Sequence, residues 1–162
     1  MGVWPACGKD IDAVMNLLEH ARDWQRRRAV GVWNDFDRSQ LAADIAAGCV
    51  HLAKEEGTIG GAVTLLDSEE LLWQDGCDAL YLHRLVSARR GSGALLIGWS
   101  RVVAQWRGKR CVRLETWSEN AALRAYYERH GFRHVIDRAF PIDSPAPADY
   151  RGTTKSFYQL DI

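Results

Sequence analysis

A short basic turn is the stretch of this chain whose residue types and spacing best suit chemistry. Positions 89 to 93 read Arg-Arg-Gly-Ser-Gly, between an apolar stretch at 79–86 and apolar residues at helical spacing. The first turn of a helix presents free N–H groups and the positive end of the helix dipole, so such a turn can hold an anion. The turn matches neither GxGxxG nor GxxxxGK[ST]. An ordinary strand-to-helix turn with surface arginines therefore remains an equal interpretation.

The elements around this turn follow from apolar periodicity. Helical spacing predicts a helix from Asp10, as N-cap, to about Trp24, and a second helix from a Ser39 cap to a stop at Gly48. Alternating residues predict a hairpin of strands 49–54 and 58–66. The remaining expected elements are a strand at 79–86, a helix ending at Gly108, a strand at 111–117, a helix at 121–130, and strands at 132–136 and 154–162, with loops at 67–78 and 138–153.

This order of elements predicts a mixed α/β fold. A hairpin that feeds a strand-helix-strand-helix unit gives a mixed sheet with helices on both faces. The 162 residues suffice for one domain with a real core, so we expect a single domain spanning residues 1–162.

Composition excludes several function classes. Lys+Arg and Asp+Glu are both 21, so the chain lacks the basic surface of a nucleic-acid binder, and any anion site must be local. The four cysteines are widely spaced without a CxxC pair, which favours reduced thiols over a zinc site or disulfides. No apolar run approaches membrane-spanning length, and the N-terminus lacks a signal pattern. We therefore expect a cytoplasmic protein with no nucleic-acid or membrane partner.

A second stretch, one helix and one strand downstream of the turn, carries a family resemblance. The pattern Asn-x-x-Ala-x-x-x-Tyr-Glu-x-x-Gly-Phe is met by Asn120, Tyr127, Glu128, Gly131 and Phe132. With the turn, it resembles the GNAT superfamily of acetyl-CoA-dependent N-acetyltransferases, in its single-domain bacterial form, over roughly residues 9–162. The resemblance implies the GNAT fold: a mostly antiparallel central sheet of about six to seven strands, one splayed parallel pair, and helices on both faces.

The chain departs from the family pattern in two places, the turn and the downstream helix. The family turn reads Gln/Arg-x-x-Gly-x-Gly/Ala. One register places Ala88 at its first position, and the other starts at Arg90 and places Leu95 at the final small position. Leu123 stands where the family usually has a small residue. Backbone N–H groups can still hold a phosphate in either register.

The resemblance implies acetyl-CoA as cosubstrate and no metal. The pantetheine arm would pair with the central strand as an added strand would, the diphosphate would lie on the turn, and the thioester would lie beside the downstream helix. The implied binding residues are Leu85, Val86, Arg89, Arg90, Gly91, Ser92, Gly93, Ala94, Asn120, Tyr126 and Tyr127.

Acetyl transfer to an amine requires a neutral amine, a stabilised oxyanion and a proton for the departing thiolate. Tyr127 matches the family's general acid, with a core role and Tyr126 facing the pocket as the alternative. The backbone N–H of Val86 would stabilise the oxyanion. Glu115 is a candidate base or a solvated strand carboxylate. His83, whose ordinary pKa lies near neutrality, is a second candidate base or a structural histidine.

The family's acceptor site lies between the early helices and the later loops. Trp33, Asp35, Phe36, His83 and Trp117 are the candidate acceptor-binding residues, with core packing as the alternative for the aromatic ones. Aromatic walls with one carboxylate suit an amine of modest size. We predict direct acetyl transfer, in a ternary complex, to a primary amine of a small molecule, with a protein or peptide amine less favoured.

The sequence leaves two other functions open. A catalytically silent CoA-binding module, acting as a regulator or assembly partner, would share the same fold. A nucleotide-binding P-loop is disfavoured because the Lys-Ser/Thr pair is missing. The pattern is compatible with a monomer or a homodimer and does not name the acceptor.

Overall fold

A seven-stranded sheet forms the centre of the computed structural model, which describes residues 1–28, 31–69 and 71–162. The strands are β1 (Gly2–Pro5), β2 (Val50–Glu55), β3 (Thr58–Leu66), β4 (Ala79–Ser87), β5 (Cys111–Trp117), β6 (Arg133–Phe140) and β7 (Thr153–Asp161), in the order β1-β2-β3-β4-β5-β7-β6. Neighbouring strands are antiparallel except β4 and β5, which are parallel. The expected mixed sheet is confirmed.

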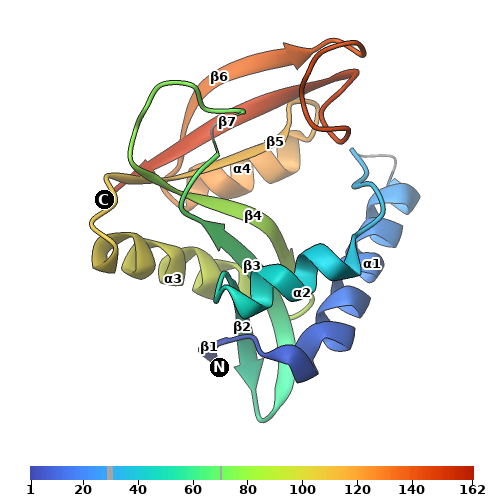
Figure 1. The fold of residues 1–162 in the computed structure, drawn as a ribbon, viewed down its shortest axis with the longest axis vertical. Helices are drawn as coiled ribbons and strands as arrows, with labels where there is room; N and C mark the ends of the chain where they lie inside the picture. The colour runs from blue at the N-terminus through green and yellow to red at the C-terminus, as the bar shows by residue number, and fades with distance from the viewer. Residues whose placement is uncertain (29–30, 70) are drawn as a thin grey trace.

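Helices cover both faces of this sheet (Figure 1). The helices are α1 (Ile11–Arg28), α2 (Arg38–Ala46), α3 (Ser92–Trp106) and α4 (Ala121–Arg129), and a short 3-10 helix, η1 (Gly8–Asp10), precedes α1. Alternation along the strands separates two cores: Leu52 and Ala62 pack with α1 and α2, whereas Ala53 and Val63 pack with α3 and α4. In the described part of the chain, no helix is both long and hydrophobic enough to cross a membrane.

The parallel strands β4 and β5 stay paired over only three residues each. Their pairs end at Tyr81 and Arg113, while β5 continues along β7 to Trp117 and β4 continues along β3 to Ser87. Figure 1 shows the two strands diverging beyond this point. The sheet therefore opens between β4 and β5, as the family resemblance implies.

A β-bulge lies in β4 at the start of this opening. His83 pairs with Thr64 and Val86 with Ala62, so Arg84 and Leu85 together oppose a single residue of β3. Arg84 has a left-handed backbone with φ of 51°, which is uncommon for a residue with a side chain. Its guanidinium contacts the Asp44 carboxylate on α2 at 3.2 Å. The bulge changes the direction of β4 where the strand leaves β5.

Several element boundaries differ from the sequence-based expectation. Strand β1 was not expected, because four residues that include Pro5 show no alternation. Helix α1 continues beyond Trp24 to Arg28, since arginines in a last turn favour the negative end of the helix dipole. Asp37, rather than Ser39, caps α2 by accepting the N–H groups of Ser39 and Gln40. Strand β6 extends to Phe140 because β7 pairs with its whole length.

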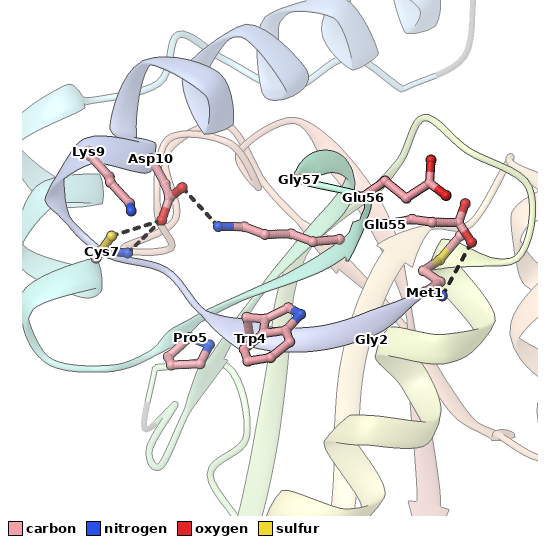
Figure 2. Close-up of a pocket in the computed structure, with 11 residues that line it drawn as sticks. Met1, Gly2, Trp4, Pro5, Cys7, Lys9, Asp10, Glu55, Glu56 and Gly57 are labelled. Atoms are coloured by element: carbon pink, nitrogen blue, oxygen red, sulfur yellow. Dashed lines mark hydrogen bonds and ion pairs between the residues drawn. The ribbon is translucent and has the colours of Figure 1, made fainter.

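The N-terminal strand is tied to the β2–β3 hairpin around Asp10 (Figure 2). One carboxylate oxygen of Asp10 accepts the Cys7 N–H at 2.9 Å, and the other contacts Lys54 Nζ at 3.0 Å. Asp10 therefore lies in η1 and bonds back to Cys7, where an N-cap of α1 was expected. The hollow of about 690 Å³ at this edge contains no residue of the expected site.

Asp10 should make stability depend on acidic pH. Burial by itself would raise the pKa of Asp10, but the Cys7 N–H and Lys54 outweigh it and lower the pKa from 3.8 to about 2. A lowered folded-state pKa gives stability that is present above the unfolded-state pKa and lost as pH falls toward about 2. We expect Asp10→Asn to lower the free energy of unfolding at pH 7 by about 1–2 kcal/mol.

Urea titrations of both proteins at pH 7, 4 and 2.5 measure this difference. The stability gap should narrow at the lowest pH, because Asp10 is then protonated in the unfolded chain and begins to take up its proton in the folded protein. A gap that stays constant across the range would contradict the role given to the charged carboxylate.

Candidate active site

A cleft of about 1140 Å³ lies where β4 and β5 separate. Its walls come from α1, α2 and the segment between them, from β4, β5 and α4, and from the loop between β6 and β7. The expected site residues that line it are Trp33, Asp35, Phe36, His83, Leu85, Val86, Gly93, Glu115, Trp117, Asn120, Tyr126 and Tyr127. The opening thus brings together expected residues from five parts of the sequence.

The basic turn lies beside this cleft, at the start of α3. Gly91 caps the helix with φ of 87°, a conformation that favours glycine. The N–H groups of Ala88 and Arg89 donate to the Gly60 carbonyl at 2.8 and 3.0 Å. Among the described residues, the N–H groups of Arg90, Gly91 and Ala94 have no acceptor. The turn therefore offers free donors at the N-terminus of α3, but Arg89, Arg90, Gly91, Ser92 and Ala94 are not among the residues that line the cleft.

The two arginines of the turn differ in availability. The Arg89 guanidinium contacts Glu55 at 3.1 Å on the β2–β3 hairpin, and its aliphatic part packs over Gly60. Arg90 is exposed and has no ion pair within the described chain. Of the two, Arg90 is the cation free to meet a ligand.

Two serines, the buried Ser92 and the exposed Ser87, hold the turn against β3. Ser92 Oγ lies 2.8 Å from the Gly60 carbonyl oxygen and 2.8 Å from Ser87 Oγ. The Gly93 N–H donates to Ser87 Oγ at 3.2 Å. These contacts require a very close approach of β3, and a Cβ on Gly61 would lie 2.7 Å from the Val86 carbonyl oxygen.

This close approach predicts a large effect of a single methyl group. We expect Gly61→Ala to lower the free energy of unfolding by about 1–3 kcal/mol, because the clash is with backbone rather than with a flexible side chain. Gly98→Ala is the matched control, since a Cβ there meets nothing within 4 Å and alanine favours a helix. Denaturant titration should show loss of stability only at position 61; equal stability of the two variants would contradict the proposed packing.

Two neighbouring tyrosines of α4 reach the cleft from the helix side. Tyr127 is buried, with its ring 5.7 Å from that of Phe132 and 6.3 Å from that of Tyr158. Burial, together with Tyr126 and the Glu115 charge, raises the pKa of Tyr127, so its hydroxyl keeps its proton at neutral pH. The Tyr126 hydroxyl lies close to Gly93, where a Cβ would be only 2.6 Å from it. Tyr127 is thus both a core residue and a lining residue.

Glu115 faces the cleft from β5. One carboxylate oxygen accepts the Trp73 indole N–H and the other accepts the Tyr150 hydroxyl at 3.3 Å. Burial raises the pKa of Glu115, although the His83 charge and the Trp73 N–H oppose this. The carboxylate is therefore held in place by two aromatic donors, unlike a solvated strand residue.

His83 lies on β4, near Glu115. Its Nε2 is 3.1 Å from a carboxylate oxygen of Glu69. Burial would lower the pKa of His83, but Glu69 and Glu115 outweigh it and raise the pKa. A raised pKa favours the protonated form of His83, which makes His83 the weaker of the two candidate bases.

Residues 31–37, before α2, close over one end of the cleft. Gly31 lies against the Trp117 ring, so closely that a Cβ would be 2.1 Å from it. Asn34 donates to Asp149 on the loop between β6 and β7. Trp33 and Phe36 pack edge to face at 5.7 Å, and Asp35 is paired with Arg22. The acceptor end is therefore enclosed by two loops that meet.

Sequence reasoning missed residues around Glu115, among them the lining residues Glu69, Tyr150 and Lys155 and the hydrogen-bond donor Trp73. They belong to the loops at 67–78 and 138–153 or directly follow them. A tryptophan in a polar loop was the available signal for Trp73, but nothing local points to the others. Across the described residues, no group of three or more His, Cys, Asp or Glu side chains is placed to hold a metal ion.

No protein-family model matches the chain. A protein of Bacillus subtilis named as the N-acetyltransferase YesJ is 28% identical over 145 residues, with 81% of each chain covered.

Solved structures of acetyltransferases have the same fold. A GNAT-family acetyltransferase of Listeria monocytogenes superposes with a TM-score of 0.77 at 21% identity, covering 99% of this chain and 94% of that one. The yncA protein of Salmonella typhimurium, solved with acetyl-CoA, gives 0.72 at 21% identity, covering 99% and 93%. A ribosomal-protein-alanine N-acetyltransferase of Brucella melitensis gives 0.74 at 17% identity, covering both chains fully. The comparisons confirm the expected fold.

Proposed function

We propose that the chain is an N-acetyltransferase of the GNAT type, and that it transfers the acetyl group of acetyl-CoA to the primary amine of a small molecule. The observation that carries this proposal is the opening between β4 and β5, with Tyr127 and Glu115 both lining it. An acetyl carrier entering from the turn would reach the acid and the base in one cleft.

The edge of β4 supports binding of an extended amide chain. The Ala88 N–H donates to the Gly60 carbonyl, so these two residues form a hydrogen-bonded pair of the antiparallel ladder. Such pairs recur at every second residue, so Val86 and Ala62 form the next one. The Val86 N–H is therefore directed at β3, which disfavours the oxyanion role expected for it. The Leu85 carbonyl and the Ser87 N–H then point into the opening. One acceptor and one donor suit the amides of a pantetheine arm.

The turn before α3 supports binding of the diphosphate. Arg90, Gly91 and Ala94 offer N–H groups without acceptors, and Arg90 adds a free positive charge. With its diphosphate at the turn and its pantetheine arm along β4, acetyl-CoA would supply the activated acetyl group in the cleft.

The proton transfers would be divided between two residues. Glu115 would take a proton from the acceptor ammonium, directly or through water, and so release the amine lone pair. The amine would attack the acetyl carbonyl, forming a C–N bond while the C–S bond breaks. Tyr127, which keeps its proton at neutral pH, would donate it to the departing sulfur, and the second proton of the attacking nitrogen would restore the Tyr127 hydroxyl. Neither role requires a covalent acetyl-enzyme.

The enclosed acceptor end favours a small molecule over a protein. Gly31 against Trp117, and Asn34 against Asp149, close the cleft over the candidate acceptor residues. A flexible peptide terminus is the second candidate, because the solved relative from Brucella is named for a ribosomal-protein alanine.

The test is a panel of small primary amines and short peptides, assayed with acetyl-CoA for thiol release and acetylated product, alongside CoA titration by calorimetry. Turnover on small amines would support the proposal. Turnover on peptides alone would assign the acceptor class to peptides. CoA binding without turnover on any amine would contradict the enzyme and favour a silent binding module.

A further inference from the structure

We propose that Lys155 binds an anionic group of the acceptor, so that the preferred substrates are amines carrying a carboxylate or a phosphonate close to the amine, as amino acids do. This inference rests on the proposed function and specifies the acceptor class for the same cleft.

Lys155 is a buried cation that lines the cleft. Its side chain lies between two aromatic rings, with Nζ 3.7 Å from the Trp117 ring centre and 4.9 Å from the Tyr150 ring centre. The residue is only 4% exposed. Among the described residues, its ammonium takes part in no hydrogen bond and no ion pair, and Nζ is not one of the fully buried atoms without a partner. Burial accordingly lowers its pKa from 10.5 to about 8.

The Lys155 ammonium has no hydrogen-bond partner among the described residues to replace the water that it loses on burial. Aromatic faces attract the charge, but they do not satisfy three N–H donors. Burial of an unpaired charge is costly, so such groups are normally paired. An oxygen anion brought in by a ligand would supply the missing partner through charge-assisted hydrogen bonds.

The sheet register places Lys155 beside Glu115. Trp117 pairs with Lys155 and Glu115 pairs with Phe157 across β5 and β7. Glu115 and Lys155 are therefore diagonal neighbours on one face, with backbones about 7–8 Å apart. Tyr150 joins them, since its hydroxyl donates to Glu115 and its ring lies over Lys155. An acceptor with its ammonium at Glu115 and its carboxylate at Lys155 would match both charges.

Three carboxylates act on Lys155 from a distance. Glu119, Asp149 and Glu115 all raise its pKa, but less than burial lowers it. Glu119 and Asp149 are exposed, so solvent and salt screen them. The third, Glu115, would be occupied by the ammonium of the acceptor. The ammonium of Lys155 remains available to an anion.

Matched substrate pairs test the inference directly. Each pair contains an amino acid and the amine that lacks its carboxylate, such as L-phenylalanine with phenethylamine and L-valine with isobutylamine. A third arm uses the corresponding aminophosphonates. The readout is the ratio of kcat/KM for the anionic acceptor to that for the plain amine, in the unmodified protein, in Lys155→Met, and in Lys9→Met as an exposed-lysine control.

We expect the ratio to exceed about tenfold in the unmodified protein and in Lys9→Met, and to fall by at least about tenfold in Lys155→Met, mainly through KM. The carboxylate and phosphonate arms show which anion is preferred. An unchanged ratio in Lys155→Met, or no preference for either anion, would overturn the inference while leaving the proposed acetyl transfer intact.

A binding experiment tests the anion site without requiring acetyl transfer, and it uses a second variant of Lys155. Calorimetry with 3-phenylpropanoate, which has the carboxylate but no amine, is run on the unmodified protein and on Lys155→Gln, each checked for folding by thermal unfolding. Binding that weakens at least about tenfold in the variant supports the anion site even if no amine is acetylated. Equal binding by both proteins, or no binding by either, would overturn it.

Discussion

Replacing Tyr127 with Phe is expected to lower kcat for acetyl transfer about a hundredfold, the usual scale of a lost general acid. The ring keeps its packing against Phe132 and Tyr158, so the fold and the affinity for CoA should change little. Burial keeps the Tyr127 hydroxyl protonated, and the variant removes that proton donor from the cleft. Steady-state kinetics measure the change in kcat, and a separate binding measurement gives the change in CoA affinity with which it is compared.

Tyr158→Phe is the matched control for this prediction. Tyr158 belongs to the same aromatic cluster, but its hydroxyl bonds to Glu128 and Arg124 outside the cleft. We expect this variant to be less stable but close to normal in kcat. Full activity of Tyr127→Phe would remove Tyr127 from the mechanism, and a loss confined to Tyr126→Phe would transfer the role to its neighbour.

Replacing Glu115 with Gln is expected to lower kcat/KM at neutral pH by about 10²–10³-fold, through loss of the general base. The amide has nearly the same shape, and its oxygen can still accept the Trp73 N–H. Because burial raises the pKa of Glu115, the base form is lost as pH falls through that raised pKa. The unmodified protein should therefore show a limb of rising activity with pH, and the variant should lack it.

His83→Gln separates the two candidate bases. Burial would lower the pKa of His83, but Glu69 and Glu115 raise it, which favours the protonated form and makes His83 the weaker candidate base. We expect the acidic limb of the pH–rate profile to persist in His83→Gln, shifted because a positive charge beside Glu115 is gone. A limb that disappears in His83→Gln and remains in Glu115→Gln would reverse the assignment.

The elements that carry the opening were predictable because their sequences obey local rules. Each signal affects only the residues next to it in the sequence. These signals are the apolar run before the turn, the glycines at 91 and 93, and the Asn120 cap of α4. The parallel β4–β5 pair followed from the family resemblance and not from periodicity. Together these features placed most of the expected residues on one cleft.

The remaining features depend on contacts between distant segments, which no local pattern reports. Arg84 takes a left-handed conformation because the β3 register requires an extra residue in β4 there. The direction of the Val86 N–H follows from the same ladder. The burial of the Lys155 ammonium depends on the rings of Trp117, at the end of β5, and Tyr150, in a distant loop. Polar loop sequences gave no sign of these contacts.

A crystal structure of the protein with acetyl-CoA tests the account most directly. The account predicts the pantetheine arm in the opening between β4 and β5, with an amide on the Leu85 carbonyl and the Ser87 N–H, and the diphosphate on residues 90–94. The acetyl group should face Glu115 and Tyr127. Acetyl-CoA bound elsewhere, or a thioester out of reach of both residues, would contradict it.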